Sequence, residues 1–368
     1  MSYYILPKNI HKLFFSIKTQ SQELDTYTSY SLFNYNISIQ KQIIKISEDV
    51  YSSIIFKNIT KIINPYENIF SKLYGCKTSI SKLSETLSIF YDYIEIMYNL
   101  NIFENYNFPI NISLYGSEEN NKSIHNSLKV FRDYDDLIMN INVLDSDLDL
   151  DSDKSILKQE VLYFDFNIEF NNINEYVIYL LKCILKILKY QMCNGISIIK
   201  MDGIFHKPII NVLYILSSFY DKVYIIKPST SNVFTYHKNI VCKNFILKDN
   251  QEIINYYENI YNFIKSYTFD SSNYICEIID NDISYYFLNK IDEINIIIGQ
   301  QQLDYFIQCI NIFKNKNREE KLEYIKKINI QKCSQWCEKF KIPYHKVIDK
   351  NNMFLPDKLE DEEINDIN

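Results

Sequence analysis

The stretch that decides the fold is GISIIKMDGIFHKPIINVLYILSSFYDKVYIIKPSTSNVFTYHKNIVCKNFIL, residues 195–247. It contains three short apolar runs, 195–201, 222–228 and 239–247, which have the length and the Ile and Val content of buried strands. Residues 208–220, between the first two runs, are long enough for the helix that a crossover between parallel strands needs. The order strand, helix, strand, strand predicts an α/β fold.

The same alternation of strand-like and helix-like segments extends upstream of this stretch. Residues 172–192 are apolar on most sides and predict a second crossover helix. Four more apolar runs predict strands, at 87–92, 110–116, 135–141 and 161–167. We therefore expect a Rossmann-like domain with a seven-stranded, mostly parallel sheet.

Helical patterns flank this domain on both sides. The segment 39–63 repeats apolar residues at helical spacing, and 250–268 and 300–342 are mostly helical in pattern. The chain ends in the charged sequence DKLEDEEIND. We divide it into a helical N-terminal extension, a sheet domain and a helical C-terminal region with a charged tail, at 1–63, 64–270 and 271–368.

The composition is that of a folded globular protein. Hydrophobic residues make up 47% of the 368 residues, and aromatic residues make up 15%. The net charge of -7 argues against a protein that coats nucleic acid with a broadly basic surface. It does not exclude a local basic groove. The N-terminus lacks the apolar core of a signal peptide, and no apolar run approaches the length of a membrane span. We expect an intracellular, cytoplasmic protein without membrane contact.

Metal binding is not expected from the cysteines or the acidic residues. The eight cysteines are scattered, and Cys333 and Cys337 have no second Cys or His pair at ligand spacing, which favours buried thiols. The run LDSDLDLDSD, residues 144–153, lacks the Gly and the closing Glu of an EF-hand loop, and we interpret it as a solvated acidic loop.

The block 195–247 resembles the FtsJ-type RNA 2'-O-methyltransferases. In that family a strand ends in a catalytic Lys, a helix follows, a second strand ends in Lys-Pro before Ser, Thr or Arg residues, and the last strand carries an Ile/Leu-Val-Cys pattern. Lys200 matches the catalytic lysine, 227–231 (Lys-Pro-Ser-Thr-Ser) match the loop, and 240–242 (Ile-Val-Cys) match the last strand. The resemblance covers about 64–270, and within the family this chain is similar in pattern to members from large cytoplasmic DNA viruses.

The resemblance implies a catalytic tetrad of Lys, Asp, Lys and Glu and a methyl donor, S-adenosylmethionine. It places the first three on Lys72, Asp165 and Lys200, but the Glu position holds His237, which we interpret as a surface residue. A lysine held by carboxylates can polarise a ribose hydroxyl, and an imidazole cannot replace a carboxylate's charge. The implied RNA-binding residues are Lys227, Ser229, Ser231 and Lys238.

The donor loop also departs from the family pattern. The family has a Gly-rich turn after its first strand, where the backbone approaches the donor. We take 87–92 as the first strand, and 111–118 are similar in placement to the family's second strand. No glycine then lies within reach of the turn after the first strand, since the chain's five glycines are at 75, 116, 195, 203 and 299. The shape of residues 90–98, open or filled, therefore separates an enzyme from a scaffold.

Three hypotheses follow. The chain is an inactive homologue that supports a protein partner in an RNA-processing or capping complex, an RNA-binding module that keeps only the substrate groove, or an active methyltransferase acting on cap or ribosomal RNA through an unusual donor pocket. Lys200, Lys227, Lys238 and Lys243 would line the RNA groove in the second, although a solvated rim explains them equally well.

Overall fold

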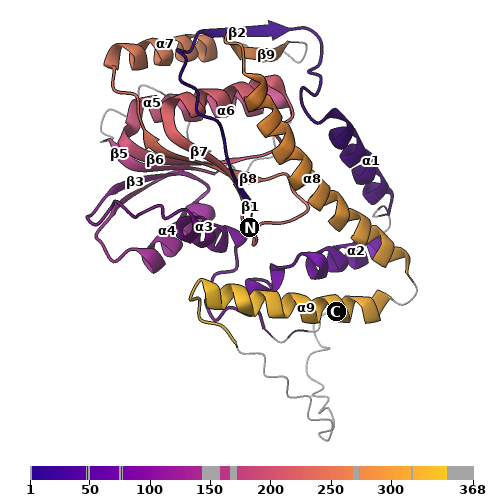
Figure 1. Ribbon diagram of the computed structural model, residues 1–368. Coiled ribbons are helices and arrows are strands. Elements are labelled where there is room, and N and C mark those ends of the chain that lie inside the picture. Colours follow the sequence, from indigo (N-terminus) through magenta and orange to yellow (C-terminus); the bar gives the residue numbers. More distant parts are fainter. Residues whose placement is uncertain are drawn as a thin grey trace, which may run out of the picture.

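A computed structural model gives the fold, and it describes the chain in segments separated by short gaps (Figure 1). The described residues are 2–46, 48, 50–73, 76, 78–142, 158–165, 172–267, 273–315 and 318–345. The acidic run 144–153 and the charged tail lie outside them, so their predicted solvated character stays a prediction.

A seven-stranded sheet forms the centre of the molecule, in the order β1-β7-β8-β6-β5-β3-β4. The pairs β4–β3, β3–β5 and β5–β6 are parallel, whereas β6–β8, β8–β7 and β7–β1 are antiparallel. The predicted α/β class is confirmed, but the sheet is mixed and not mostly parallel, because three of its six strand pairs are antiparallel. The strands are β1 (Ser2–Ile5), β3 (Asn111–Gly116), β4 (Leu137–Asn142), β5 (Gln159–Phe164), β6 (Gln191–Met201), β7 (Tyr220–Lys227) and β8 (Lys238–Phe245).

One of the seven predicted strands is wrong. Residues 87–92 lie at the start of a helix, α3 (Ser88–Asn99), in which eight of the twelve residues are buried. A helix buried on most sides reads as a continuous apolar run, and a six-residue window of such a run cannot tell strand from helix. The seventh strand is β1, which pairs with β7 from the other end of the domain sequence. As a result β3, expected as the second strand, is the first strand of the chain within the parallel group.

Helices cover both faces of the sheet (Figure 1). The helices α5 (Ile173–Tyr190), α6 (Lys207–Phe219) and α7 (Asn250–Ser266) lie on one face, and α3 and α4 (Glu118–Phe131) lie on the other. The strand pleat distributes side chains to both cores. In β5, Leu162 and Phe164 join the first core, while Val161 and Tyr163 join the second together with Trp336 of the C-terminal helix.

Four long helices pack beside the sheet. They are α1 (Tyr30–Ile46), α2 (Val50–Ile63), α8 (Tyr285–Lys314) and α9 (Arg318–Lys339), with the short η1 (Glu67–Ile69) after α2. Small apolar clusters join α2 to α8 and α1 to α8, and Phe234, from the loop between β7 and β8, packs against both clusters. Residues 1–63 were predicted to be a helical extension. They contain the expected helices α1 and α2 but also the two strands β1 and β2.

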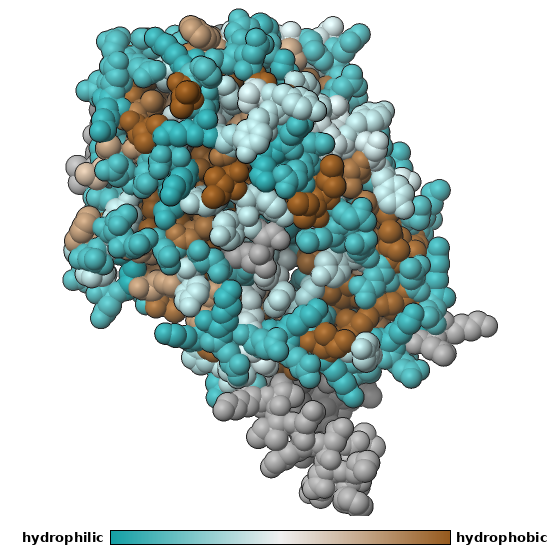
Figure 2. Space-filling model, viewed as in Figure 1, coloured by the Kyte–Doolittle hydropathy of each residue, from teal (hydrophilic) through white to brown (hydrophobic). Residues whose placement is uncertain are grey.

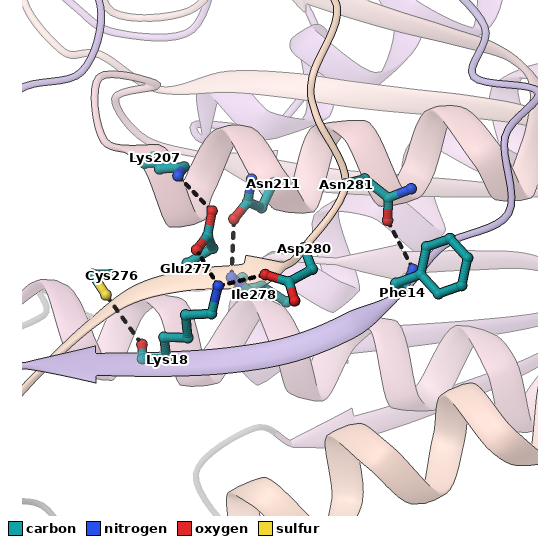
Figure 3. A network of polar contacts seen from close by, with 9 residues as sticks. All are labelled: Phe14, Lys18, Lys207, Asn211, Cys276, Glu277, Ile278, Asp280 and Asn281. Carbon is teal, nitrogen blue, oxygen red and sulfur yellow. Dashed lines mark hydrogen bonds and ion pairs between the residues drawn. The ribbon is translucent and has the colours of Figure 1, made fainter.

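The second of these strands, β2 (Phe15–Gln20), pairs with β9 (Tyr274–Ile279) in a separate two-stranded sheet (Figure 3). Lys18 of β2 forms ion pairs with Glu277 and Asp280, and Glu277 also pairs with Lys207 of α6. We call these four residues the β2–β9 clasp. It fastens the N-terminal segment and β9 onto α6, where Asn211 also accepts a hydrogen bond from the backbone N–H of Ile278 at 3.0 Å.

The outer surface mixes residue types. On the face shown in Figure 2, hydrophobic residues are interspersed among hydrophilic ones. Within the described part of the chain, no helix is long and apolar enough to cross a membrane.

Candidate site at the carboxyl edge of the sheet

Two of the predicted site residues meet at the edge where the parallel strands end. Asp165 directly follows β5, and Lys200 is the penultimate residue of the neighbouring strand β6. The Lys200 Nζ lies 2.9 Å from Asp165 Oδ1; the Asp165 side chain is fully buried, and that of Lys200 is 21% exposed. Adjacent parallel strands bring residues at their carboxyl ends together, which explains why these two residues, named from the family resemblance, lie side by side.

The sheet has its topological switch point beside this pair. The chain leaves β3 for its neighbour β4 on one side and then continues from β5 on the other side. In open α/β sheets, ligands bind in the crevice outside the carboxyl ends of such strands. The crevice of this protein is therefore bordered by Gly116, the last residue of β3, and by Asp165 after β5.

This crevice is filled by the first turn of α4. The Asn120 Nδ2 donates to Asp165 Oδ2 at 2.6 Å, and the Asn121 Nδ2 donates to the carbonyl oxygens of Leu114 and Gly116 at 3.2 and 3.3 Å. A Cβ on Gly116 would lie 2.8 Å from Asn121 Oδ1, so the asparagine packs directly onto the glycine. In an open crevice, the Asp165 carboxylate and the carbonyl oxygens at the end of β3 would face a ligand. Here they accept hydrogen bonds from Asn120 and Asn121 instead.

Gly116 also revises the expectation about the donor loop. With β3 in place of 87–92, a glycine does stand at the end of the first parallel strand. The turn then continues with Ser117, which caps α4, and with Glu118 and Glu119 in the first helical turn. Two carboxylates at this helix N-terminus already complement its dipole, and they disfavour a second anion there.

A small cavity of about 80 Å³ opens next to the Asp165–Lys200 pair. Its lining includes Asp92 of α3, Lys200 and His237. His237 is half-buried, which corrects its interpretation as a surface residue. Burial lowers its pKa, with the nearby Asp202 acting in the opposite direction.

Asp92 is the group that α3 contributes to this cavity. It accepts hydrogen bonds from the hydroxyls of Thr230 and Ser231 in the loop between β7 and β8. Burial raises its pKa to about 7, although these two bonds and the positive Lys200 act in the opposite direction. Lys72, predicted for the site, is exposed, does not line the cavity, and makes no hydrogen bond or ion pair with another described residue. The side chain beside Lys200 is therefore an aspartate, not Lys72.

The four residues predicted to bind RNA are buried or half-buried, and three of them make internal contacts. The Lys227 ammonium donates to the carbonyl oxygens of Thr235 and His237, and burial lowers its pKa to about 8. Lys238 is only 2% exposed, and burial, together with the positive Lys227, lowers its pKa to about 7. The Lys238 ammonium forms neither hydrogen bond nor ion pair within the described chain.

Ser229 and Ser231 are held by carboxylates of α3. Glu95, which is 1% exposed, accepts from the backbone N–H and the hydroxyl of Ser229 and from the indole Nε1 of Trp336 at 3.0 Å. Asp92 and Glu95 are three residues apart on one helix face, and together they fix the loop 228–237 onto α3. Asp92 was missed because 87–92 were expected to be a strand, and Glu95 was missed because it lies in the turn expected after that strand.

The cysteine pair is buried, as expected from sequence. Cys333 and Cys337 are free thiols in α9, and burial raises the pKa of Cys337 to about 12. In the described ranges, no group of three or more His, Cys, Asp or Glu side chains could hold a metal ion.

Comparison with known proteins adds no relative to this picture. No family model matches the chain, and no curated protein matches it either.

Proposed function

We propose that this chain is an FtsJ-like RNA 2'-O-methyltransferase homologue that does not transfer methyl groups and instead serves as a support or RNA-binding subunit in an RNA-processing or capping complex. The family assignment is supported by the order β6, α6, β7, β8. A strand carrying Lys200, a helix, a strand ending at Lys227-Pro228 and a strand with Ile-Val-Cys follow one another as the resemblance predicts. The finer description of the sheet as a methyltransferase fold belongs to this proposal.

The loss of activity is carried by the filled crevice. Asn120 and Asn121 occupy the switch point and bond to Asp165 and to the end of β3. The cavity beside them measures about 80 Å³, whereas sites for ligands the size of S-adenosylmethionine span on the order of 300–1,000 Å³. The residues present therefore do not fit the donor. Residues 90–98, which belong to the closely packed helix α3, agree with a scaffold.

The charges of the cavity also depart from those of the implied tetrad. Asp92 takes the place beside Lys200 where a second lysine is implied, and His237 replaces the glutamate. Two aspartates now face one lysine, and Lys200 is held by an ion pair to Asp165. Two of the four side chains of the implied tetrad, the first lysine and the glutamate, are therefore replaced in this cavity.

Calorimetric titration with S-adenosylmethionine tests this proposal. We expect no heat of binding at millimolar donor, with far-UV circular dichroism verifying that the sample is folded. Saturable binding, or transfer of a labelled methyl group to RNA, would overturn it.

The active-enzyme alternative is favoured by one observation, the 2.9 Å pair between Asp165 and Lys200. Methyl transfer to capped or ribosomal RNA that is lost in Lys200→Ala would establish it. The RNA-binding role predicts RNA binding that weakens as salt increases and that is abolished in the double variant Lys200→Glu/Lys227→Glu. A pure support role predicts a stable protein complex and no such RNA binding.

A further inference from the structure

A second, larger cavity lies on the other side of the loop 228–237. It measures about 400 Å³, which is within the range of small-molecule sites. Three separate parts of the chain form it: the turn Pro65–Tyr66 after α2, the end of β7 with its loop, and one face of α8. Ser231 lines both this cavity and the one beside Lys200. We call it the α8 cavity.

Aromatic side chains lie on two of its walls. Tyr66 comes from the turn and Tyr305 from α8, and both are half-buried. Tyr305 is held by an edge contact with Phe234, with ring centroids 6.3 Å apart. Aromatic rings presented in a cavity bind planar heterocycles by stacking, and this is sequence-tolerant because every base has a flat face.

A positive wall lies at the loop end of the cavity. Lys227 lines it and uses two of its three ammonium donors on the carbonyl oxygens of Thr235 and His237, so one donor is left for a ligand. Lys238 is buried near Lys227 but does not line the cavity, and its pKa of about 7 leaves it only partly protonated at neutral pH. The positive group at this wall is therefore the Lys227 ammonium, and a buried ammonium favours an anion beside it.

One carboxylate, that of Asp304, is among the lining residues, and the Glu95 carboxylate lies near Tyr66. Asp304 is exposed, and its Oδ1 accepts a hydrogen bond from Gln300 at 3.1 Å. It is on α8, as is Gln301, whose amide can both donate to and accept from a base edge. The cavity thus combines flat aromatic surfaces, a mixed polar rim and a cationic end.

We infer that the α8 cavity binds one nucleoside 5'-phosphate unit, with its base against Tyr66 and Tyr305 and its phosphate toward Lys227. The unit comes either from a free mononucleotide or from single-stranded RNA. The choice of a nucleotide rests in part on the proposed function, whereas the cavity is distinct from the filled crevice at Asp165.

Binding of free AMP, GMP and UMP, of the matching nucleosides and of a labelled eight-nucleotide single-stranded RNA to the full chain tests this inference. We expect saturable binding of at least one mononucleotide or of the RNA. Because stacking on one aromatic ring strengthens binding by about fivefold to 150-fold, Tyr66→Ala and Tyr305→Ala should each weaken it about fivefold or more. Tyr305→Phe should leave it nearly unchanged.

Matched variants separate the two ends of the cavity from general effects. Lys227→Gln should reduce the preference for the nucleotide over its nucleoside, while nucleoside binding persists. Tyr285→Ala is the control, since Tyr285 is 78% exposed at the far end of the same helix. Binding of RNA but not of mononucleotides would identify RNA as the source, and binding of both would identify a free nucleotide as sufficient.

Two results would overturn the inference. One is the absence of saturable binding of every nucleotide and of RNA at millimolar and micromolar concentrations, respectively. The other is binding that Tyr66→Ala and Tyr305→Ala leave unchanged while both variants keep the wild-type circular dichroism. Neither result depends on S-adenosylmethionine, so this inference and the proposed loss of methyl transfer can fail independently.

Discussion

Two charged networks of this protein differ in how water reaches them. In the network at the sheet edge, the fully buried Asp165 side chain is shared by Lys200 and Asn120. In the β2–β9 clasp, Lys18, Asp280 and Lys207 are 48%, 54% and 39% exposed, and only Glu277, at 19%, is largely covered. In the network at the sheet edge, protein groups take the place of water around the Asp165 carboxylate. In the clasp, Lys18 and Asp280 keep much of their contact with water while they form ion pairs.

The comparison teaches that distance alone does not rank these ion pairs. A buried carboxylate that loses its partners keeps the cost of desolvation, whereas an exposed one returns to water. We therefore expect substitutions in the buried network to be costly and insensitive to salt, and those in the clasp to be mild and sensitive to salt.

Removing the buried carboxylate should have the largest effect. Asp165→Ala leaves Lys200 and the amide of Asn120 without their acceptor, and we expect the free energy of unfolding to fall by about 3 kcal/mol. Urea unfolding followed by circular dichroism measures this. Asp165→Asn, which keeps the shape and one acceptor oxygen, should cost less. A loss below about 1 kcal/mol for Asp165→Ala would mean that the site is wetter than its geometry indicates.

The carboxylate of Glu95 extends the buried side of the comparison. Three donors converge on it: the backbone N–H and the hydroxyl of Ser229 and the indole of Trp336. In Glu95→Gln the side-chain amide NH2 would face one of these donors and could not accept its hydrogen bond. We expect a loss of about 2 kcal/mol. Because Trp336 is the single tryptophan of the chain, its fluorescence emission reports the change directly.

The exposed Glu104 offers a control for this variant, since Glu104→Gln should leave both stability and emission unaltered. An unchanged emission in Glu95→Gln would contradict the hydrogen bond to the indole.

The parts of the fold that could be predicted from sequence are those made by neighbouring segments. The order β6, α6, β7, β8 was predicted because each apolar run is bounded locally and the crossover helix has the required length. β1 was missed because it is only four residues long and is stabilised by pairing with β7, more than 200 residues later. No local pattern carries that information.

The site divides in the same way. Asp165 and Lys200 were named because the family resemblance implies them, and they meet because the ends of adjacent parallel strands lie at one edge of the sheet. Asn120 and Asn121 were not, since a polar run at a helix start is ordinary, and only the topology shows that it fills the switch-point crevice. Glu95 needs Trp336, a partner 241 residues away, to become recognisable as a clamp.

The smallest effect is expected in the clasp. Glu277→Gln removes ion pairs to Lys18 and Lys207 and should cost less than about 1 kcal/mol at low salt, because the two lysines are 48% and 39% exposed and stay hydrated, although Glu277 itself is 19% exposed. Burial raises the pKa of Glu277, but hydrogen bonds from Lys207 and Lys18 outweigh it, so that the pKa lies below its usual value of 4.5. The stabilisation is therefore present at neutral pH and is lost as the pH falls through the folded-state pKa.

Thermal unfolding of wild type and Glu277→Gln at pH 7 and pH 3, each at 50 mM and 1 M NaCl, separates these contributions. The two proteins should differ at pH 7 in low salt and converge both in 1 M NaCl and at pH 3, since salt screens the pairs and acid protonates the carboxylate. Asp165→Ala at pH 7 should keep its deficit in 1 M NaCl. If Glu277→Gln kept its deficit in high salt as well, the clasp would behave as a buried network, and the contrast between the two regions would not hold.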